Sequence, residues 1–282
     1  MLRVIISADK LMTFDRNQFK RLERAGYDRI GPRYLAAAAT REGIAAALLD
    51  AAALAPGLCM LDLASGPGVL ARSASGRIGA AGLMIASDIS QGQLTCCPDL
   101  PRVAADGEAL PFADASFDRV LCGLGLMFFP DAEAALHEMR RVLRAQGRLA
   151  LSVWGPANEV PLVECALACM RRLLPPPKVA RPSIFRFGDA EELNRHLASA
   201  DFHACEIHPH RFTLEFASAA AYWQAFLDLA GGAAESLSRL PPEKQQALAT
   251  GVAEELAPYR SQDGYRLTST VLIATATCGQ KP

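Results

Sequence analysis

A short segment near residue 60 carries the residues whose types and spacing most clearly suggest ligand chemistry. Residues 61–71 predict an apolar strand, a loop of small residues and the start of a helix. Gly66 and Gly68 would let a ligand approach the backbone N–H groups at the positive end of that helix. Asp62, four residues before the first glycine, would repel a pyrophosphate but suits a ligand that bears an ammonium group. The segment therefore predicts a site for a ligand that carries a positive charge.

The same loop also fits the dinucleotide fingerprint Gly-x-Gly-x-x-Gly/Ala over residues 66–71. Both interpretations need an acidic residue at the end of the second strand, where it would hold ribose hydroxyls. Asp88, 26 residues after Asp62, fits either one. The loop and Asp88 alone therefore leave open an NAD(P)-dependent oxidoreductase.

A second acidic stretch favours a different family. After the third expected strand the sequence reads Asp106-Gly107-Glu108-Ala109-Leu110-Pro111-Phe112 and then Ser116-Phe117-Asp118. This stretch resembles the Asp-Ala-Glu-x-Leu-Pro-Phe…Ser-Phe-Asp motif of the methyltransferases that act on ubiquinone and menaquinone precursors (the methyltransferase type 11 domain). The Asp-x-Ala-x-Gly-x-Gly pattern of residues 62–68 resembles the first motif of the class I S-adenosylmethionine-dependent methyltransferases. With Glu138 and residues 141–149, the resemblance runs over residues 58–154, although Ala145-Gln146-Gly147 replaces the usual Pro-Gly-Gly turn.

The resemblance implies that S-adenosyl-L-methionine is the cofactor, that S-adenosyl-L-homocysteine is the product and that no metal takes part. It implies that Asp62 or its neighbours hold the amino group, directly or through water, that Asp88 holds the ribose hydroxyls, and that Asp106 with Gly107 holds the edge of the adenine. The expected cofactor-binding residues are Asp62, Ala64, Ser65, Gly66, Gly68, Asp88, Ile89, Gln93, Asp106, Gly107, Glu108, Gly123, Leu124 and the expected lid residues Tyr27 and Tyr34.

The expected acceptor is an apolar or aromatic small molecule, methylated at oxygen or carbon. Methyltransferases of nucleic-acid amines place Asn/Asp-Pro-Pro-Tyr/Phe after the fourth strand, where this chain has the apolar residues 124–129. The expected substrate-pocket residues are Met127, Phe128, Trp154, Phe187, Tyr222 and Trp223. No catalytic base is assigned, because for each of the five histidines a surface or structural role is the simpler interpretation.

Two alternatives stay open. An oxidoreductase is disfavoured because the chain lacks Tyr-x-x-x-Lys and has few lysines. A cofactor binder of the same fold that is repurposed for a non-methylating reaction is also open, because cofactor motifs report binding and not turnover.

The composition of the 282 residues is that of an ordinary globular protein, with 51% hydrophobic and 21% charged residues. The formal charge of −1 gives no overall attraction for nucleic acid or anionic membranes. Without a long apolar run or a convincing signal peptide, no membrane span and a cytoplasmic location are expected. The eight cysteines contain no Cys-x-x-Cys pair, so a structural zinc site is not predicted. A homodimer is a possible assembly, and Met12 is an alternative start.

The alternation of strands and helices predicts an α/β fold. Strands are expected at 58–63, 83–87, 102–105, 119–123, 148–154, 204–216 and 266–277, with helices over 14–54, from 69, at 131–144 and 189–200, and within 217–259. The resemblance makes this a Rossmann-like, doubly wound, mostly parallel seven-stranded sheet. The expected organisation is an N-terminal helical lid (1–55), a cofactor-binding core (56–216 and 264–279) and a helical cap inserted before the last strand (217–263).

Overall fold

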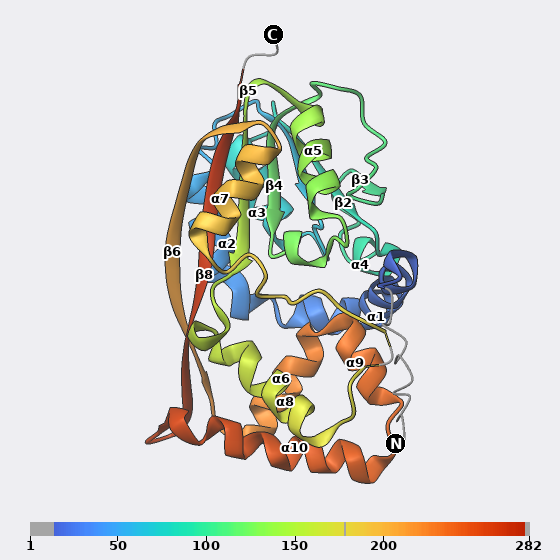
Figure 1. The fold of residues 1–282 in the computed structure, drawn as a ribbon. Coiled ribbons are helices and arrows are strands. Elements are labelled where there is room, and N and C mark those ends of the chain that lie inside the picture. The colour runs from blue at the N-terminus through green and yellow to red at the C-terminus, as the bar shows by residue number, and fades with distance from the viewer. Residues whose placement is uncertain (1–13, 178, 280–282) are drawn as a thin grey trace, which may run out of the picture.

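A single sheet forms the centre of the computed structural model, which describes residues 14–177 and 179–279 (Figure 1). Its strands are β1 (Cys59–Leu63), β2 (Leu83–Asp88), β3 (Arg102–Ala104), β4 (Phe117–Gly123), β5 (Leu143–Trp154), β6 (Phe202–Phe216), β7 (Arg260–Ser261) and β8 (Gly264–Cys278). They lie in the order β3-β2-β1-β4-β5-β8-β6, and β7 pairs with β8. The first five strands are parallel, whereas β8 runs antiparallel to both β5 and β6. The carboxyl ends of β1, β2, β3, β4 and β5 therefore meet at one edge of the sheet.

Helices connect the strands and cover the sheet. They are α1 (Arg16–Ala36), α2 (Glu42–Ala51), α3 (Val69–Ile78), α4 (Gln91–Leu94), α5 (Ala132–Val142), α6 (Pro161–Leu173), α7 (Ala190–Ser199), α8 (Ala219–Leu229), α9 (Gly231–Ser238) and α10 (Pro242–Leu256). Short 3₁₀ turns are η1 (Ala38–Arg41), η2 (Leu126–Phe128), η3 (Ala157–Glu159) and η4 (Ala257–Tyr259). Among the described residues, no helix combines the length and the apolar character needed to cross a membrane.

The two faces of the sheet bury separate cores. On one face α5 and α7 pack over the sheet, with Leu136 buried in the same cluster as Leu151 of β5 (Figure 1). On the other face Leu48 of α2 and Leu70 of α3 are buried with Ala150. Neighbouring residues of β5 thus point to opposite faces, as the two-residue period of a strand requires. Burial on both faces explains the apolar runs within the parallel strands, such as residues 59–61 of β1 and 149–151 of β5.

A group of helices, α6, α8, α9 and α10, packs at one end of the sheet and is called the helical group below (Figure 1). It packs on the first half of β8, residues 264–270. This half pairs with β6 but lies beyond the part of β8 that pairs with β5. Tyr265 and Leu267 on this extension are buried with Cys165 of α6 and Tyr222 of α8. The long β6–β8 hairpin therefore joins the helical group to the sheet.

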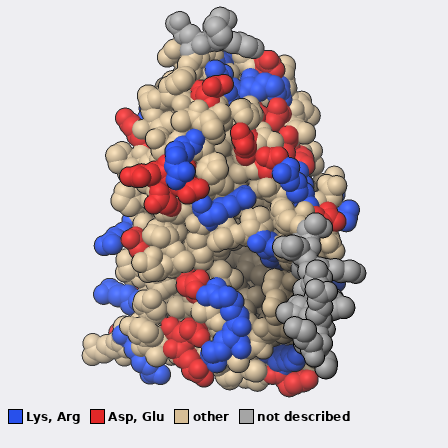
Figure 2. Space-filling view, in the orientation of Figure 1, with Lys and Arg blue, Asp and Glu red and all other residues tan. Residues whose placement is uncertain are grey.

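Helix α1 lies between the sheet and the helical group (Figure 1). The Asp15 side chain caps it by accepting a hydrogen bond from the Gln18 N–H at 2.9 Å. Close approach to α9 requires glycine: a Cβ on Gly26 would lie 2.4 Å from the Gly231 carbonyl carbon. In Figure 2 the visible face is hollowed at this level, and acidic and basic side chains are interspersed over it.

The mostly parallel, doubly wound sheet confirms the expected fold class, and the element limits add corrections. β5 begins at Leu143 rather than at residue 148, and Gln146 at φ 63° marks the irregularity within it. Helix α1 continues through Pro32, and β7 and α6 were not expected. The division into lid, core and cap stays a prediction, although α6 from outside residues 217–263 packs within the helical group. Met12 lies outside the described residues.

Candidate functional site

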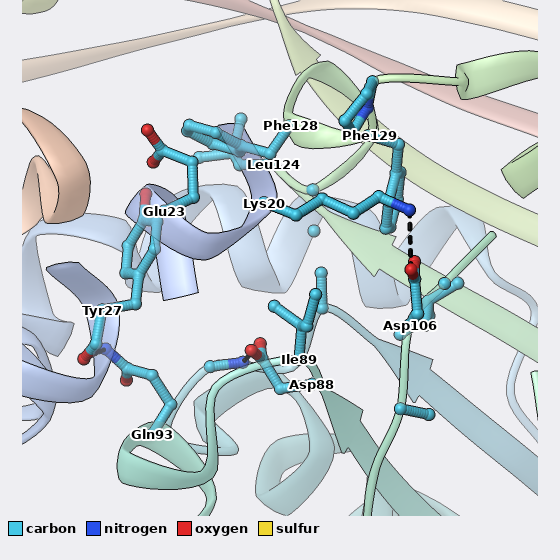
Figure 3. Close-up of a pocket in the computed structure, with 18 of the residues that line it drawn as sticks. Lys20, Glu23, Tyr27, Asp88, Ile89, Gln93, Asp106, Leu124, Phe128 and Phe129 are labelled. Carbon is cyan, nitrogen blue, oxygen red and sulfur yellow. Dashed lines mark hydrogen bonds and ion pairs between the residues drawn. The ribbon is translucent and has the colours of Figure 1, made fainter. Parts of the chain in front are cut away.

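A cavity opens at the carboxyl ends of β1, β2 and β4, where the crevice of an open α/β sheet binds ligands. It contains about 780 Å³ of space that continues into solvent. Figure 3 shows residues of α1 on one side of it and the strand ends on the other. A second cavity of about 550 Å³ lies under the glycine loop, and Tyr34, Ala64, Gly66, Gly123 and Leu124 line both. The expected cofactor-binding residues are thus largely brought together.

The glycine loop has backbone conformations that favour glycine. Gly66 has φ 55°, and Gly68, with φ 75°, is the N-cap of α3. Gly68 also packs closely, because an added Cβ would lie 2.8 Å from Cys97 Cβ, and it lines neither cavity. Ala64 adopts φ 56° without being glycine, a conformation that costs about 1–3 kcal/mol and is typical of functional sites. Of the two glycines, Gly66 therefore borders the ligand space and Gly68 secures the turn.

Asp88 holds this loop in place. Its carboxylate accepts hydrogen bonds from the Gly66 N–H and the Ser90 N–H, each at 2.8 Å. Burial raises the pKa of Asp88 to about 6, and these two N–H groups oppose the shift. Each carboxylate oxygen keeps a free lone pair, so Asp88 can position the loop and still accept from a ligand hydroxyl. Its predicted role toward the ribose stays a prediction.

Asp62 lies at the end of β1 with 1% of its surface exposed. Neither of its oxygens has a hydrogen-bond partner among the described residues. Burial, helped by the charge of nearby Asp88, raises the pKa of Asp62 to about 8; the Ala71 N–H opposes this without making a well-formed hydrogen bond. Asp62 lines the second cavity together with Ser65. A carboxyl group in this state can accept hydrogen bonds from a cation that enters the cavity.

Asp106 and Glu108 are bound to a lysine that the sequence analysis did not single out. Lys20 of α1 contacts Asp106 Oδ2 and Glu108 Oε2, each at 2.6 Å (Figure 3 shows the first). Burial lowers the pKa of Lys20, but the two carboxylates outweigh it and the pKa is raised. Glu108 also accepts from the Asp131 N–H at 2.9 Å, which fixes the start of α5. Lys20 thus fastens α1 to the third strand's loop, and no local motif signals it.

Aromatic rings form the wall of the cavity on the α1 side. Tyr27 makes edge-to-face contacts with Tyr34 and Phe128, with both centroid distances at 5.8 Å. Burial raises the pKa of Tyr27 well above its usual value, so its phenol is neutral. Gln93 donates through Nε2 to the Tyr27 carbonyl at 3.0 Å, and its buried Oε1 has no partner in the described chain. Ile89 and Gly107 complete the opposite wall.

Of the expected substrate-pocket residues, Phe128 is the one that lines either of these two cavities, and the role of the others stays a prediction. Phe128 lines the main cavity, but Met127 is buried in the core beneath α5. Trp154 packs against Phe212, and Phe187 packs against His196. Tyr222 and Trp223 are buried in the helical group, where the Tyr222 hydroxyl donates to the Leu162 carbonyl at 2.9 Å. A large apolar side chain gives the same sequence pattern whether it packs in a core or lines a pocket, so the sequence alone does not separate the two.

None of the five histidines, all within the described residues, lines either cavity. Glu23 does line the main cavity, but its carboxylate accepts from Arg181 at 2.7 Å and points away from the centre (Figure 3). Burial raises the pKa of Glu23. In residues 14–177 and 179–279, no three His, Cys, Asp or Glu side chains are arranged as a metal site.

Comparison with known proteins agrees with this geometry. Residues 61–151 match the family model described as a methyltransferase domain. This part of the chain is therefore similar to methyltransferase domains. The matched residues hold the glycine loop, the three strand-end carboxylates and β4, while α1 and the helical group lie outside the match.

Relatives extend the similarity within this part of the chain. A ubiquinone/menaquinone biosynthesis C-methyltransferase (UbiE) of Laribacter hongkongensis is 38% identical over 124 residues, 40% of this chain and 51% of the relative. A demethylmenaquinone methyltransferase of Corynebacterium urealyticum is 42% identical over 105 residues, 35% of this chain and 43% of the relative. The chain thus spans about half the length of the curated relatives it matches, or less.

A solved structure shows the same fold over more of the chain. The phosphoethanolamine N-methyltransferase 2 of Haemonchus contortus, in complex with S-adenosylhomocysteine, has a TM-score of 0.54 and 15% identity. The alignment covers 85% of this chain and 53% of the other. At that identity the likeness concerns the fold alone.

Proposed function

We propose that this protein transfers a methyl group from S-adenosyl-L-methionine to a small apolar molecule. The observation that carries the proposal is Asp62, a buried carboxyl group with no hydrogen-bond partner among the described residues, which lines a cavity at the strand ends of the region that matches a methyltransferase domain. A buried polar group without a partner costs roughly 1–3 kcal/mol, and a bound ammonium group would remove that cost.

The remaining residues fit the other parts of the cofactor. Asp88 and Asp106, at the ends of β2 and β3, face the main cavity where a ribose and an adenine would lie. Gly107 lets the Phe129 ring pack against the backbone beside the proposed adenine position, because an added Cβ would lie 2.4 Å from that ring. Gly123 and Leu124 line both cavities and would lie beside the sulfur atom. We infer that the ligand extends from Asp106 through Asp88 to Asp62.

S-adenosyl-L-methionine supplies a methyl group on a sulfonium that is already a good leaving group. The chain therefore mainly has to hold the acceptor in line with that methyl group and exclude water, and such alignment is worth about 7–11 kcal/mol. Tyr27 and Phe128 provide an apolar wall for this purpose. Lys20 holds α1 over the opening through its two ion pairs.

We propose that the acceptor is an aromatic small molecule and that the methyl group goes to carbon. Two observations support this. The relatives include a named C-methyltransferase of quinone biosynthesis, and the rings of Tyr27, Phe128 and Phe129 line the cavity near Leu124.

Two experiments test the proposal. S-adenosylhomocysteine should raise the melting temperature of the full chain, whereas NAD should leave it unchanged. With a donor whose methyl group is isotopically labelled, hydroquinones and phenols with a free ring position should acquire the label on carbon, as read by mass spectrometry and NMR. A rise in melting temperature with NAD but not with S-adenosylhomocysteine would contradict the proposed cofactor. Binding of S-adenosylhomocysteine without label in any aromatic acceptor would contradict the proposed acceptor.

A further inference from the structure

The second cavity contains three unsatisfied polar groups of different kinds. Arg41, Asp62 and Ser65 all line it. Arg41 Nη1, both Asp62 oxygens and Ser65 Oγ are buried and have no hydrogen-bond partner in the described part of the chain. Within the described part of the chain, Arg41 and Asp62 therefore do not hydrogen-bond each other. Buried polar atoms are nearly always paired, so this cluster points to a ligand that carries complementary groups.

The orientation of Arg41 shows which part of it is available. Its guanidinium lies over the Tyr34 ring, 4.0 Å from the centroid, and Nη2 donates to the Tyr34 carbonyl at 3.1 Å. Stacking uses the face of the guanidinium and leaves its edge free. On that edge, Nη1 has no acceptor. A planar cation fixed in this way is suited to a carboxylate, which accepts hydrogen bonds in the plane of the guanidinium.

We propose that Arg41 binds the α-carboxylate of S-adenosyl-L-methionine, so that Arg41 and Asp62 together recognise the zwitterionic amino-acid end of the cofactor. This inference rests on the proposed function. It adds a specificity-determining residue that lies in η1, outside the matched methyltransferase domain. Ser65 Oγ, on the loop that follows β1, can hydrogen-bond either group of the ligand.

The charges explain why a zwitterion fits better than a simple anion. An anion on Arg41 would leave Asp62 without a partner, and a cation on Asp62 would leave Arg41 without one. A ligand with an ammonium and a carboxylate on one carbon satisfies both at once and brings no net charge into a buried site. Tyr34 lines both cavities, so Arg41 also connects this end of the ligand to the wall of the main cavity.

The test is a thermodynamic cycle in which the Arg41 guanidinium, the ligand carboxylate or both are removed. Binding is measured by isothermal titration calorimetry on the full chain. The ligands are S-adenosylhomocysteine and its decarboxylated analogue, which keeps the amine. The proteins are the wild type, Arg41→Met and the matched control Arg33→Met, a half-exposed arginine of α1 that pairs with Asp228. Melting temperatures of the ligand-free proteins check that each variant folds. If Arg41→Met does not fold, Arg41→Lys provides a second measurement.

In the wild type, removing the carboxylate should weaken binding about tenfold to a hundredfold, the usual effect of losing a charged hydrogen bond. Arg41→Met should weaken S-adenosylhomocysteine binding by the same factor and leave the analogue unchanged, and Arg41→Lys should fall between. Equal losses for both ligands in Arg41→Met would overturn the inference, because Arg41 would then act only through Tyr34. Failure of the wild type to bind either ligand would instead contradict the proposed function.

Discussion

The state of Asp62 makes a quantitative prediction about how cofactor binding depends on pH. With a pKa of about 8, the empty protein carries a proton on this side chain at neutral pH. A bound ammonium group favours the charged carboxylate, so binding must displace that proton. At pH 7 the protonated fraction is about nine-tenths, and the protein should therefore release about 0.9 protons from Asp62 for each ligand bound.

The affinity follows from the same fractions. The charged form of Asp62 makes up roughly 1% of the empty protein at pH 6 and roughly 9% at pH 7, so affinity should rise roughly tenfold over this interval. Asp88, with a pKa of about 6, changes in the same direction but by roughly twofold at most. At higher pH the affinity should fall again, once the amino group of the ligand loses its proton.

Isothermal titration calorimetry with S-adenosylhomocysteine in phosphate and in Tris measures the released protons, because the two buffers differ in ionisation enthalpy. Asp62→Asn should bind more weakly, with the release from this site abolished and the affinity nearly flat between pH 6 and 7. The matched control Asp263→Asn changes an exposed aspartate in the turn before β8 and should behave as the wild type. A wild-type protein that releases no proton at pH 7 and binds equally at pH 6 would refute the reasoning.

Three further substitutions test separate parts of the site. Gly107→Ala would place a Cβ 2.4 Å from the Phe129 ring, so that ring must move, and both the melting temperature and the S-adenosylhomocysteine affinity measured by calorimetry should fall. Gly68→Ala, at φ 75° and 2.8 Å from Cys97, should instead lower the unfolding free energy by roughly 1–3 kcal/mol in urea titrations. Lys20→Met should destabilise the fold by roughly 1–2 kcal/mol and speed amide hydrogen exchange across α1; unchanged exchange there would show that the ion pairs do not hold the helix.

Sequence reasoning predicted the parts of the site that local geometry determines. Asp62, Gly66 and Asp88 were predicted because a strand end, a tight turn and a helix start leave few choices of residue type, and each of them lines one or both of the cavities. Lys20 and Arg41 were missed because they lie in α1 and η1, 42 and 21 residues before Asp62, and reach the site by packing that no local pattern reports. Their signal is visible only in space, as two ion pairs for one and an unsatisfied guanidinium edge for the other.

Unsatisfied polar atoms separate the ligand site from the rest of the interior more sharply than hydrophobicity does. The described residues contain nine buried side-chain atoms without a hydrogen bond, and five of them belong to Arg41, Asp62, Ser65 and Gln93, which line the two cavities. Aromatic side chains do not distinguish the ligand site from the rest of the interior, because residues such as Trp154 also pack well in a core. Each unsatisfied atom disfavours the empty fold, and a ligand that pairs with all five removes this cost at once. Selection for binding therefore leaves its trace as a local loss of stability, which is why the most informative residues of this chain are those that the fold alone does not explain.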